Sequence, residues 1–288
     1  MIATLTRLRP MFVPTRGGGI PVGFFIAILV ALVLMAIFAP WIAPNDPDRQ
    51  NLMGRLKPPG TEVRDVFYLM GSDELGRDLF SRVIYGARIS LSVAVLSVML
   101  SGAVGITLGM LAGYARGWTE TVIMRLVDIF LSIPAILLAI ITVAVLGPGF
   151  VNVILVLALT RWPRYARVAY GQTLAVSGQP YVRLARAMGA SSGRVMLLHI
   201  LPNIIAALSV VATLEFGLMV LFEAGLSFLG LGVQPPTASW GAMLSVGRNY
   251  VASAWWIATF PGICLFLLVL SVNLIGDRLS DYLNPKSR

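Results

Sequence analysis

Residues 181–202 read YVRLARAMGASSGRVMLLHILP. This stretch lies between two long apolar runs, yet it carries three arginines and His199, the only histidine of the chain. Pro180, directly before this stretch, favours the start of a helix there, because a proline in the first turn gives up no helical hydrogen bond. Gly189 then interrupts the helix, and the serines that follow favour the start of a second one. We therefore predict a short helix–glycine–helix segment held outside the bilayer. The plainer alternative is a cytoplasmic loop whose arginines only set the topology.

The first predicted helix of this stretch has two unlike faces. Residues at i, i+3, i+4 and i+7 share one face, which here holds Tyr181, Leu184, Ala185 and Met188. The opposite side holds Arg183, Arg186, Ala187 and Ala190. One side of the segment is therefore apolar and the other is basic.

The composition is that of a membrane protein. Of the 288 residues, 57% are hydrophobic and 12% are charged, whereas about a quarter of the residues are charged in soluble domains. The apolar residues occur in runs close to the roughly 20 residues needed to cross the hydrocarbon core. We predict an all-α polytopic membrane protein with six transmembrane helices, at residues 20–41, 89–112, 121–146, 151–162, 203–224 and 254–275.

The polar segments between these runs divide the chain. The predicted divisions are a tail at 1–19, the first span at 20–41, an extracytoplasmic segment at 42–86, a membrane core at 87–276 and a tail at 277–288. Within the core, residues 171–202 form one loop. Apolar residues at helical spacing predict an amphipathic helix over 71–88, lying along the membrane surface.

The basic N-terminus allows a second interpretation of the first apolar run, as a cleavable signal peptide. We favour an anchored span, because the run is longer than a typical signal sequence and Trp41 lies between two prolines at its end. The short connections that carry most of the excess arginine and lysine then place both termini and the 171–202 loop in the cytoplasm. The net charge of +9 is this asymmetry and not a nucleic-acid patch.

Several kinds of chemistry are excluded by the residues present. The chain has no G-x-x-x-x-G-K-[ST] phosphate loop, so it does not itself hold ATP in the usual way. One cysteine, Cys264, and one histidine cannot form a disulfide or a zinc site within the chain. We expect no catalytic residue and no metal site.

Three acidic residues fall within the predicted spans, where an ionised group is costly and usually serves a cavity or a partner. Asp128 lies near the start of its span and can pair with Arg125 or reach the interface. Glu215 lies at mid-span and is the better candidate for a polar translocation path. Glu223 lies at the outer end, where a solvated role or packing in a gate is expected.

Three glycines recur at four-residue spacing, at Gly105, Gly109 and Gly113. This small-residue spacing lets two membrane helices approach closely. We predict a packing seam; incidental glycines are the alternative.

Five blocks of sequence resemble the C-type permease subunits of dipeptide and oligopeptide ABC importers, a group that includes nickel and glutathione relatives. They are GSDELGRD and GARISL within 71–91, AGY and IMRLVDI within 112–129, and YVRLARAMGAS and HILPN within 181–203. EAGLSFLGLGVQPPTASWG follows at 223–241, and WW, FPG and NLIGD lie within 255–277. The blocks occur in the order and at the spacing typical of that family, from about residue 20 to the end.

The resemblance implies that residues 181–202 are the coupling loop of the family, known as the EAA loop, which docks into a cleft of an ATPase subunit. The implied coupling residues are Arg183, Ala185, Arg186, Ala187, Gly189, Ala190, Ser191, His199, Leu201 and Pro202. Arg183 stands where the family usually has Glu, Leu184 where it has Ala, and His199 where it has Ile. The charge reversal at Arg183 removes any salt bridge assigned to that Glu, whereas the docking shape around Gly189 can be carried over.

The resemblance further implies the fold of type I ABC importer permeases and a set of partners. These are a homologous B-type permease subunit, two ATPase subunits that use ATP and Mg, an extracytoplasmic substrate-binding protein and membrane lipid. The chain itself would bind no cofactor, and its location would be a bacterial or archaeal cytoplasmic membrane. The implied candidates for a translocation path or gate are Asp128, Glu215, Glu223, Gln234 and Trp240.

Peptides are the substrate that the resemblance favours, and nickel, glutathione, haem or another small solute are alternatives. A secondary transporter or channel is the alternative of a different class, but such proteins often contain inverted repeats, and the sequence has no clear one. A membrane enzyme or assembly protein is a third class that the sequence favours less.

Overall fold

The computed structural model describes residues 22–283, so the predicted tail at 1–19 and residues 284–288 of the predicted tail at 277–288 lie outside the described part, whereas residues 277–283 continue the last helix. The described chain is built almost wholly from helices. In chain order the longer ones are α2 (Val22–Ile37), α4 (Leu79–Ala115), α5 (Gly117–Ser132), α6 (Ala135–Leu146), α7 (Phe150–Ser177), α10 (Leu201–Phe228) and α12 (Trp256–Leu283). The shorter ones are α3 (Ala39–Ile42), η2 (Leu52–Gly54), α8 (Pro180–Ala187), α9 (Ser192–Val195), η3 (Met196–Ile200), α11 (Trp240–Gly247) and η4 (Arg248–Tyr250).

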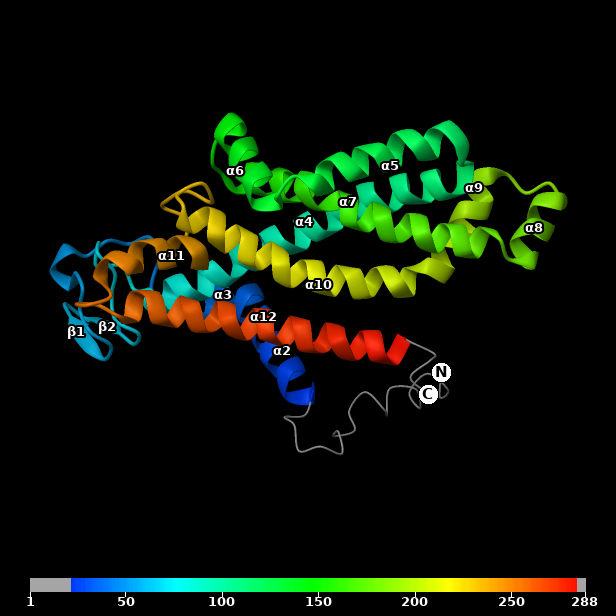
Figure 1. Ribbon diagram of the computed structural model, residues 1–288. Coiled ribbons are helices and arrows are strands. Elements are labelled where there is room, and N and C mark those ends of the chain that lie inside the picture. The colour runs from blue at the N-terminus through cyan, green and yellow to red at the C-terminus, as the bar shows by residue number, and fades with distance from the viewer. Residues whose placement is uncertain (1–21, 284–288) are drawn as a thin grey trace.

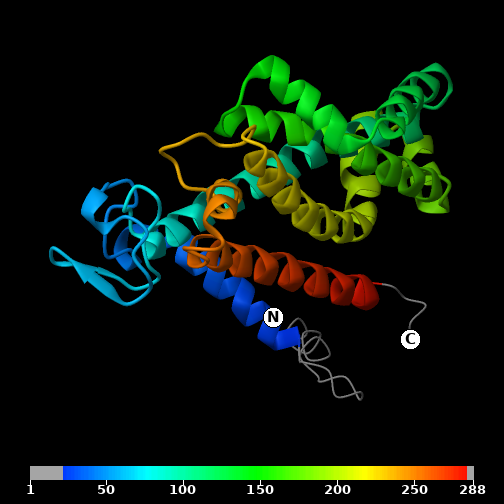
Figure 2. The same cartoon turned by 60° about the vertical axis from the view of Figure 1, so that its left-hand side comes forward.

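The molecule is elongated, with different structures at its two ends (Figure 1). One end holds a two-stranded antiparallel hairpin, β1 (Thr61–Val63) and β2 (Val66–Tyr68), together with α11. The other end holds α8 and α9. Between them, α10 has α12 and α2 on one side and α5, α6 and α7 on the other (Figure 2). The long helices therefore separate two polar ends.

Three helical stretches within residues 22–283 are long and apolar enough to cross a membrane, or four if one bent pair counts as a single span. They are Leu79–Ala115, Ser192–Phe228 and Trp256–Leu283, with Gly117–Ser132 and Ala135–Leu146 as the bent pair. The apolar helix α2 has 16 described residues. The 28-residue helix α7 is also long enough, but it carries Arg161, Arg164 and Arg167 near its middle.

The predicted amphipathic helix at 71–88 is wrong. Residues 71–78 form turns and a bridge between Ser72 and Asp78, and α4 begins at Leu79 and continues unbroken into the apolar run. Gly71 and Gly76 have φ angles of 84° and 71°, which no helix allows. The Asp73 carboxylate accepts hydrogen bonds from two backbone N–H groups ahead of it, a local arrangement that competes with helix formation.

The predicted third span is not one straight helix. It breaks at Ile133 and Pro134, and the two halves, α5 and α6, meet at 93°. Proline lacks the N–H needed to continue the helix and disfavours helical geometry in the residue before it. Ile133 is accordingly extended, with φ −93° and ψ 130°.

The second, fourth, fifth and sixth spans are longer than predicted, whereas the first helix, α2, ends at Ile37, before the predicted end at residue 41. The fourth apolar run continues as α7 to Ser177, so the first residues of the predicted 171–202 loop are helical. The fifth begins at Ser192 through α9 and the π-helical turn η3. Residues 226–250, between the fifth and sixth spans, contain α11 and η4. Charged and small polar residues ended the predicted spans too early, because a helix continues beyond the hydrocarbon core wherever its backbone hydrogen bonds remain made.

Three buried clusters hold these helices together, and one of them joins α4, α5 and α7 through Ala112, Met124, Val127, Trp162 and Ala166. The other two lie toward the two ends of the molecule. The larger lies in the half of the molecule that contains α11 and is built around residues such as Trp240, Leu157 and Met219. The smaller lies beside α8 and α9 and joins them to the long helices through Val182, Val195, Ile200, Ile204, Leu208, Met110 and Ala169. Each polar end is therefore anchored to the helical body by its own core.

Candidate functional site

Residues 180–202, called the α8 segment below, have the helix–glycine–helix form that the sequence predicts. Pro180 occupies the first turn of α8, and Gly189 ends it with a φ of 84°. Backbone hydrogen bonds from Gly189 to Arg186 (3.0 Å) and from Ala190 to Ala185 (3.1 Å) close the last turn, as in left-handed helix caps. The Ser191 hydroxyl then accepts a hydrogen bond from the Arg194 N–H and caps α9.

The apolar face predicted for α8 does not pack against the protein. Tyr181, Leu184 and Met188 are 44%, 62% and 79% exposed. The residue that anchors α8 is Val182, which is fully buried against Val195 and Ile200. Sequence periodicity missed Val182 because Arg183 and Arg186, which follow it on the same helix, suggested a solvated face. The structure thus fixes α8 by its Val182 side and leaves its larger apolar side chains unpartnered.

The basic residues of the segment have local contacts. The Arg183 Nε donates to the Gly178 carbonyl oxygen at 3.1 Å, and the Arg186 guanidinium lies 4.1 Å from the centre of the Tyr114 ring. His199 lies in η3, where its backbone carbonyl accepts from the Asn203 side chain at 2.6 Å. Leu201 and Pro202 begin α10. Arg183 therefore holds the start of α8 in place, which a glutamate at this position cannot do in the same way, since it has no donor.

Gly105, Gly109 and Gly113 lie along α4 where that helix meets α7. A Cβ atom at Gly105 would collide with the Trp162 carbonyl oxygen, and one at Gly109 with the Ala166 carbonyl oxygen. At Gly113 it would lie 2.8 Å from the Thr173 Cβ. The three glycines thus let the backbones of α4 and α7 come together, as expected for small residues at this spacing.

A cluster of three charged side chains lies at the middle of α7 and α10. Glu215 is almost fully buried, at 1% exposure. Its carboxylate oxygens lie 3.7 Å from Arg161 Nη1 and 3.4 Å from Arg164 Nη1. The Arg161 guanidinium also lies 4.1 Å from the centre of the Phe222 ring. Sequence analysis singled out Glu215 but missed both arginines, although their spacing of three residues on one helix was a usable signal.

Asp128 pairs with Arg167 of α7, not with Arg125. The pairing across two helices follows from the bend after α5, which lays that helix along α7. Both side chains of the pair are about half exposed. Asp128 therefore lies on an open polar face and is separate from the buried Glu215 cluster.

Glu223 is fully buried, so the solvated role considered for it is wrong. Its carboxylate accepts hydrogen bonds from the Ser90 hydroxyl at 3.0 Å and the Ser227 hydroxyl at 2.8 Å. The Trp240 backbone N–H points to the same Ser90 oxygen at 3.4 Å. Glu223 is thus part of the packing that joins α4, α10 and α11. Gln234 is elsewhere, with its amide on the carbonyl oxygens of Gly230 and Gly232.

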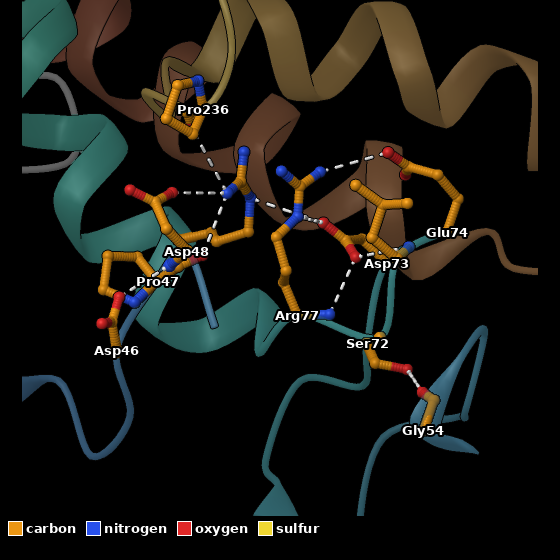
Figure 3. Close-up of polar contacts among 12 residues, drawn as sticks. Asp46, Pro47, Asp48, Gly54, Ser72, Asp73, Glu74, Arg77 and Pro236 are labelled. Atoms are coloured by element: carbon orange, nitrogen blue, oxygen red, sulfur yellow. Dashed lines mark hydrogen bonds and ion pairs between the residues drawn. The ribbon is translucent and has the colours of Figure 1, made fainter. Parts of the chain in front are cut away.

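An ionic cluster holds the polar segment that precedes α4 to the start of that helix (Figure 3). Arg77 contacts Asp73 at 2.6 Å and Glu74 at 3.1 Å. Arg82 contacts Asp48 at 3.2 Å and Asp73 at 3.5 Å, and donates to the carbonyl oxygens of Pro47 and Pro236. Burial raises the pKa of the Glu74 carboxyl above its ordinary value. Sequence analysis identified residues 42–86 only as a polar segment and did not predict that its charges join three separate stretches of the chain.

Within the described residues, no group of three or more His, Cys, Asp or Glu side chains is placed to hold a metal ion. Three features remain to be explained: the exposed apolar side chains of α8 at one end, the charged cluster at the middle of α7 and α10, and the ion-paired segment at the other end. This combination is that of a helical membrane protein with distinct structures at its two ends.

Comparison with known proteins gives the family. Residues 105–288 match the binding-protein-dependent transport system inner membrane component family, and residues 24–59 match the N-terminal transmembrane domain of oligopeptide transport permease C. The chain belongs to the binding-protein-dependent transport system inner membrane component family. It is therefore a multi-pass protein of the bacterial inner membrane.

Individual relatives agree with this assignment. The chain is 45% identical over 259 residues to a di/tripeptide transport system permease of Pseudomonas aeruginosa, covering 90% of this chain and 86% of the relative. It is 45% identical over 258 residues to a glutathione transport system permease of Escherichia coli, covering 90% and 84%. Among solved structures, an inward-facing methionine ABC transporter chain has a TM-score of 0.58 at 21% identity, with 72% of this chain and 98% of that chain covered. This last similarity shows a shared fold.

Proposed function

We propose that this chain is the permease subunit of an ATP-driven importer and forms half of the route by which peptides cross the inner membrane. A binding protein delivers the peptide at the outer end, and two ATPase subunits act at the α8 end. A homologous permease forms the other half of the route. The observation that carries the proposal is the exposed apolar face of α8, whose Leu184 and Met188 are more than half exposed at the basic end of the molecule.

The distribution of arginines supports an orientation in which the α8 end lies in the cytoplasm. Arg183, Arg186 and Arg194 cluster at the α8 end, and excess arginine marks the cytoplasmic side of membrane proteins. Both termini are then cytoplasmic, and six membrane segments result: α2, α4, α5 with α6, α7, α9 with α10, and α12. The outer surface that meets the binding protein consists of residues 42–78 and the α11 region. It replaces the surface helix that the sequence predicted at 71–88.

The mechanism follows from the way α8 is attached. Val182 packs against Val195 and Ile200, which begin the long α9–α10 helix, so α8 and α10 move as one body. Closure of the ATPase subunits on α8 is thereby transmitted to the mid-membrane cluster around Glu215. Each partner favours one global arrangement of the helices, which is the condition for coupling between distant sites. ATP and Mg are used by the ATPase subunits, and this chain supplies positioning only.

Uptake by the complete importer tests the proposal. The chain is assembled in liposomes with its sister permease, the two ATPases and the binding protein, and uptake of labelled dipeptides, oligopeptides and glutathione is measured. We expect ATP-dependent uptake of peptides that requires this chain. Uptake of glutathione alone favours the second candidate substrate, for which the glutathione relative is the supporting observation. Uptake that continues without ATP contradicts the proposed class.

A further inference from the structure

The charged cluster at the middle of α7 and α10 carries an unbalanced positive charge. Two guanidinium groups, of Arg161 and Arg164, share the single carboxylate of Glu215. Charged groups at membrane depth are costly and face a cavity or a partner instead of lipid. A surplus charge at this depth therefore indicates that an anionic group is bound there at some stage.

The two arginines are not equivalent. The Arg161 side chain is 6% exposed and its guanidinium lies against the Phe222 ring. The Arg164 side chain is 55% exposed. Arg161 is thus the internal counter-charge of Glu215, whereas Arg164 presents its guanidinium at the surface of the chain. The surplus charge of the cluster belongs to Arg164.

The Arg164 guanidinium is also incompletely used. It makes one contact, from Nη1 to a Glu215 oxygen at 3.4 Å. Among residues 22–283, no other acceptor contacts this guanidinium, so the rest of its planar fork is open. Such a fork binds a carboxylate through two parallel hydrogen bonds. Because Glu215 is held inside the protein and contacts Arg164 from one side, it orients the open edge of the fork outward.

We propose that Arg164 is a substrate-binding residue that receives the C-terminal carboxylate of a peptide as it passes through the importer, with Glu215 as the positioning residue. The proposal rests on the proposed function, because it requires that peptides pass this chain. It adds a selectivity for a free carboxylate within the membrane, independent of the choice made by the binding protein. A fixed ion pair between Arg164 and an acidic residue of the sister permease is the competing explanation.

Three variants separate these explanations. Arg164→Gln removes the charge and keeps a polar side chain, and Arg164→Lys keeps the charge without the planar fork. Arg167→Gln is the matched control, because it makes the same change on the same helix at an arginine that already pairs with Asp128. Each variant is assembled into the complete importer. Uptake is measured for one peptide and for its C-terminal amide, a pair chosen because the binding protein binds both.

The measured quantity is the ratio of uptake of the free-acid peptide to that of the amide, in which differences in the amount of assembled importer cancel. We expect Arg164→Gln to lower this ratio by about tenfold or more, since a hydrogen bond to a charged group is lost. Arg164→Lys should give an intermediate ratio, and Arg167→Gln the wild-type ratio.

Two outcomes overturn the proposal. One is a wild-type importer that takes up the free-acid peptide and its amide equally well. The other is an unchanged ratio in Arg164→Gln, whether uptake of both peptides is intact or equally reduced; the equal reduction is the result that the fixed ion pair predicts. Failure of the wild-type importer to take up either peptide is a different result, which contradicts the proposed peptide import itself.

Discussion

The indole N–H of Trp240 on α11 donates a hydrogen bond to the carbonyl oxygen of Val83 on α4 at 2.9 Å. The two residues are 157 positions apart in the chain, and Trp240 is fully buried. The same tryptophan reaches Ser90 through its backbone N–H, and Ser90 in turn donates to Glu223. The α11 region is therefore held to the long helix α4 through Trp240.

Substitutions of Trp240 should destabilise the α11 region, by an amount that depends on whether the ring is kept. Trp240→Phe removes the indole hydrogen bond and should cost about 0.5–1.5 kcal/mol. Trp240→Ala also leaves a large cavity and should cost about 3–5 kcal/mol. The measurement is the thermal midpoint of the purified protein in detergent, with limited proteolysis of residues 229–250 as a local readout. Equal midpoints for the two variants would contradict a packing role for the ring.

The glycine seam between α4 and α7 should tolerate no added side chain. Gly109→Ala places a methyl group against the Ala166 backbone, and overpacking of this kind costs about 1–3 kcal/mol. Gly225→Ala is the matched control, because Gly225 lies within α10 with no atom within 4 Å of an added Cβ. In that variant the higher helix propensity of alanine should raise stability by up to about 1 kcal/mol. Thermal midpoints of the two variants that move in the same direction would contradict the seam.

Gly189 should be needed for its backbone conformation and not for space. An added Cβ at Gly189 meets no atom within 4 Å, but its φ of 84° strains any other residue. Gly189→Ala should therefore re-orient the end of α8 and lower binding-protein-stimulated ATP hydrolysis several-fold, while membrane insertion is kept. Gly193→Ala, a nearby exposed glycine without positive φ, should change the rate little. A Gly189→Trp variant with normal transport would count against α8 as the coupling element.

The ionic cluster around Arg77 and Arg82 should make the stability of residues 42–78 depend on pH. Burial raises the pKa of the Glu74 carboxyl above its ordinary value, so folding favours the protonated carboxyl more than the unfolded chain does. The resulting stabilisation is fully present below the ordinary pKa and is lost as the pH rises through the raised folded value. As the pH rises from the ordinary pKa of Glu74 through its raised value, backbone hydrogen exchange of residues 42–78 should therefore become faster. The increase should exceed the increase that pH causes in an unstructured chain. Glu74→Gln should abolish this dependence and Glu62→Gln, on the exposed β1 residue, should keep it; the reverse pattern would refute the assignment.

Local sequence signals predicted much of the α8 segment. Pro180, Gly189 and Ser191 each act on their own backbone, and the structure uses them as the start, end and cap that their chemistry favours. The bend after α5 had an equally local signal in Pro134, which the strong hydrophobicity of the run on both sides concealed.

The rest of the site depended on contacts between distant parts of the chain. Glu215 was recognised as an unusual charge, but its partners lie more than 50 positions away on α7. Likewise, nothing in the sequence near Arg82 indicates that it meets Asp48 and the Pro236 carbonyl oxygen. Such pairings are set by how whole helices pack, and hydrophobic periodicity reports only which side of one helix is buried.

The most direct test of the account is to determine which protein meets each end of the chain. A photo-crosslinking residue is placed at Met188 on α8, which is 79% exposed, and separately at Phe67 on β2, which is 52% exposed. Both variants are assembled into the complete importer and illuminated. The account predicts that the Met188 position crosslinks to an ATPase subunit and the Phe67 position to the binding protein. Crosslinks from Met188 to the binding protein, or from Phe67 to an ATPase, would contradict it.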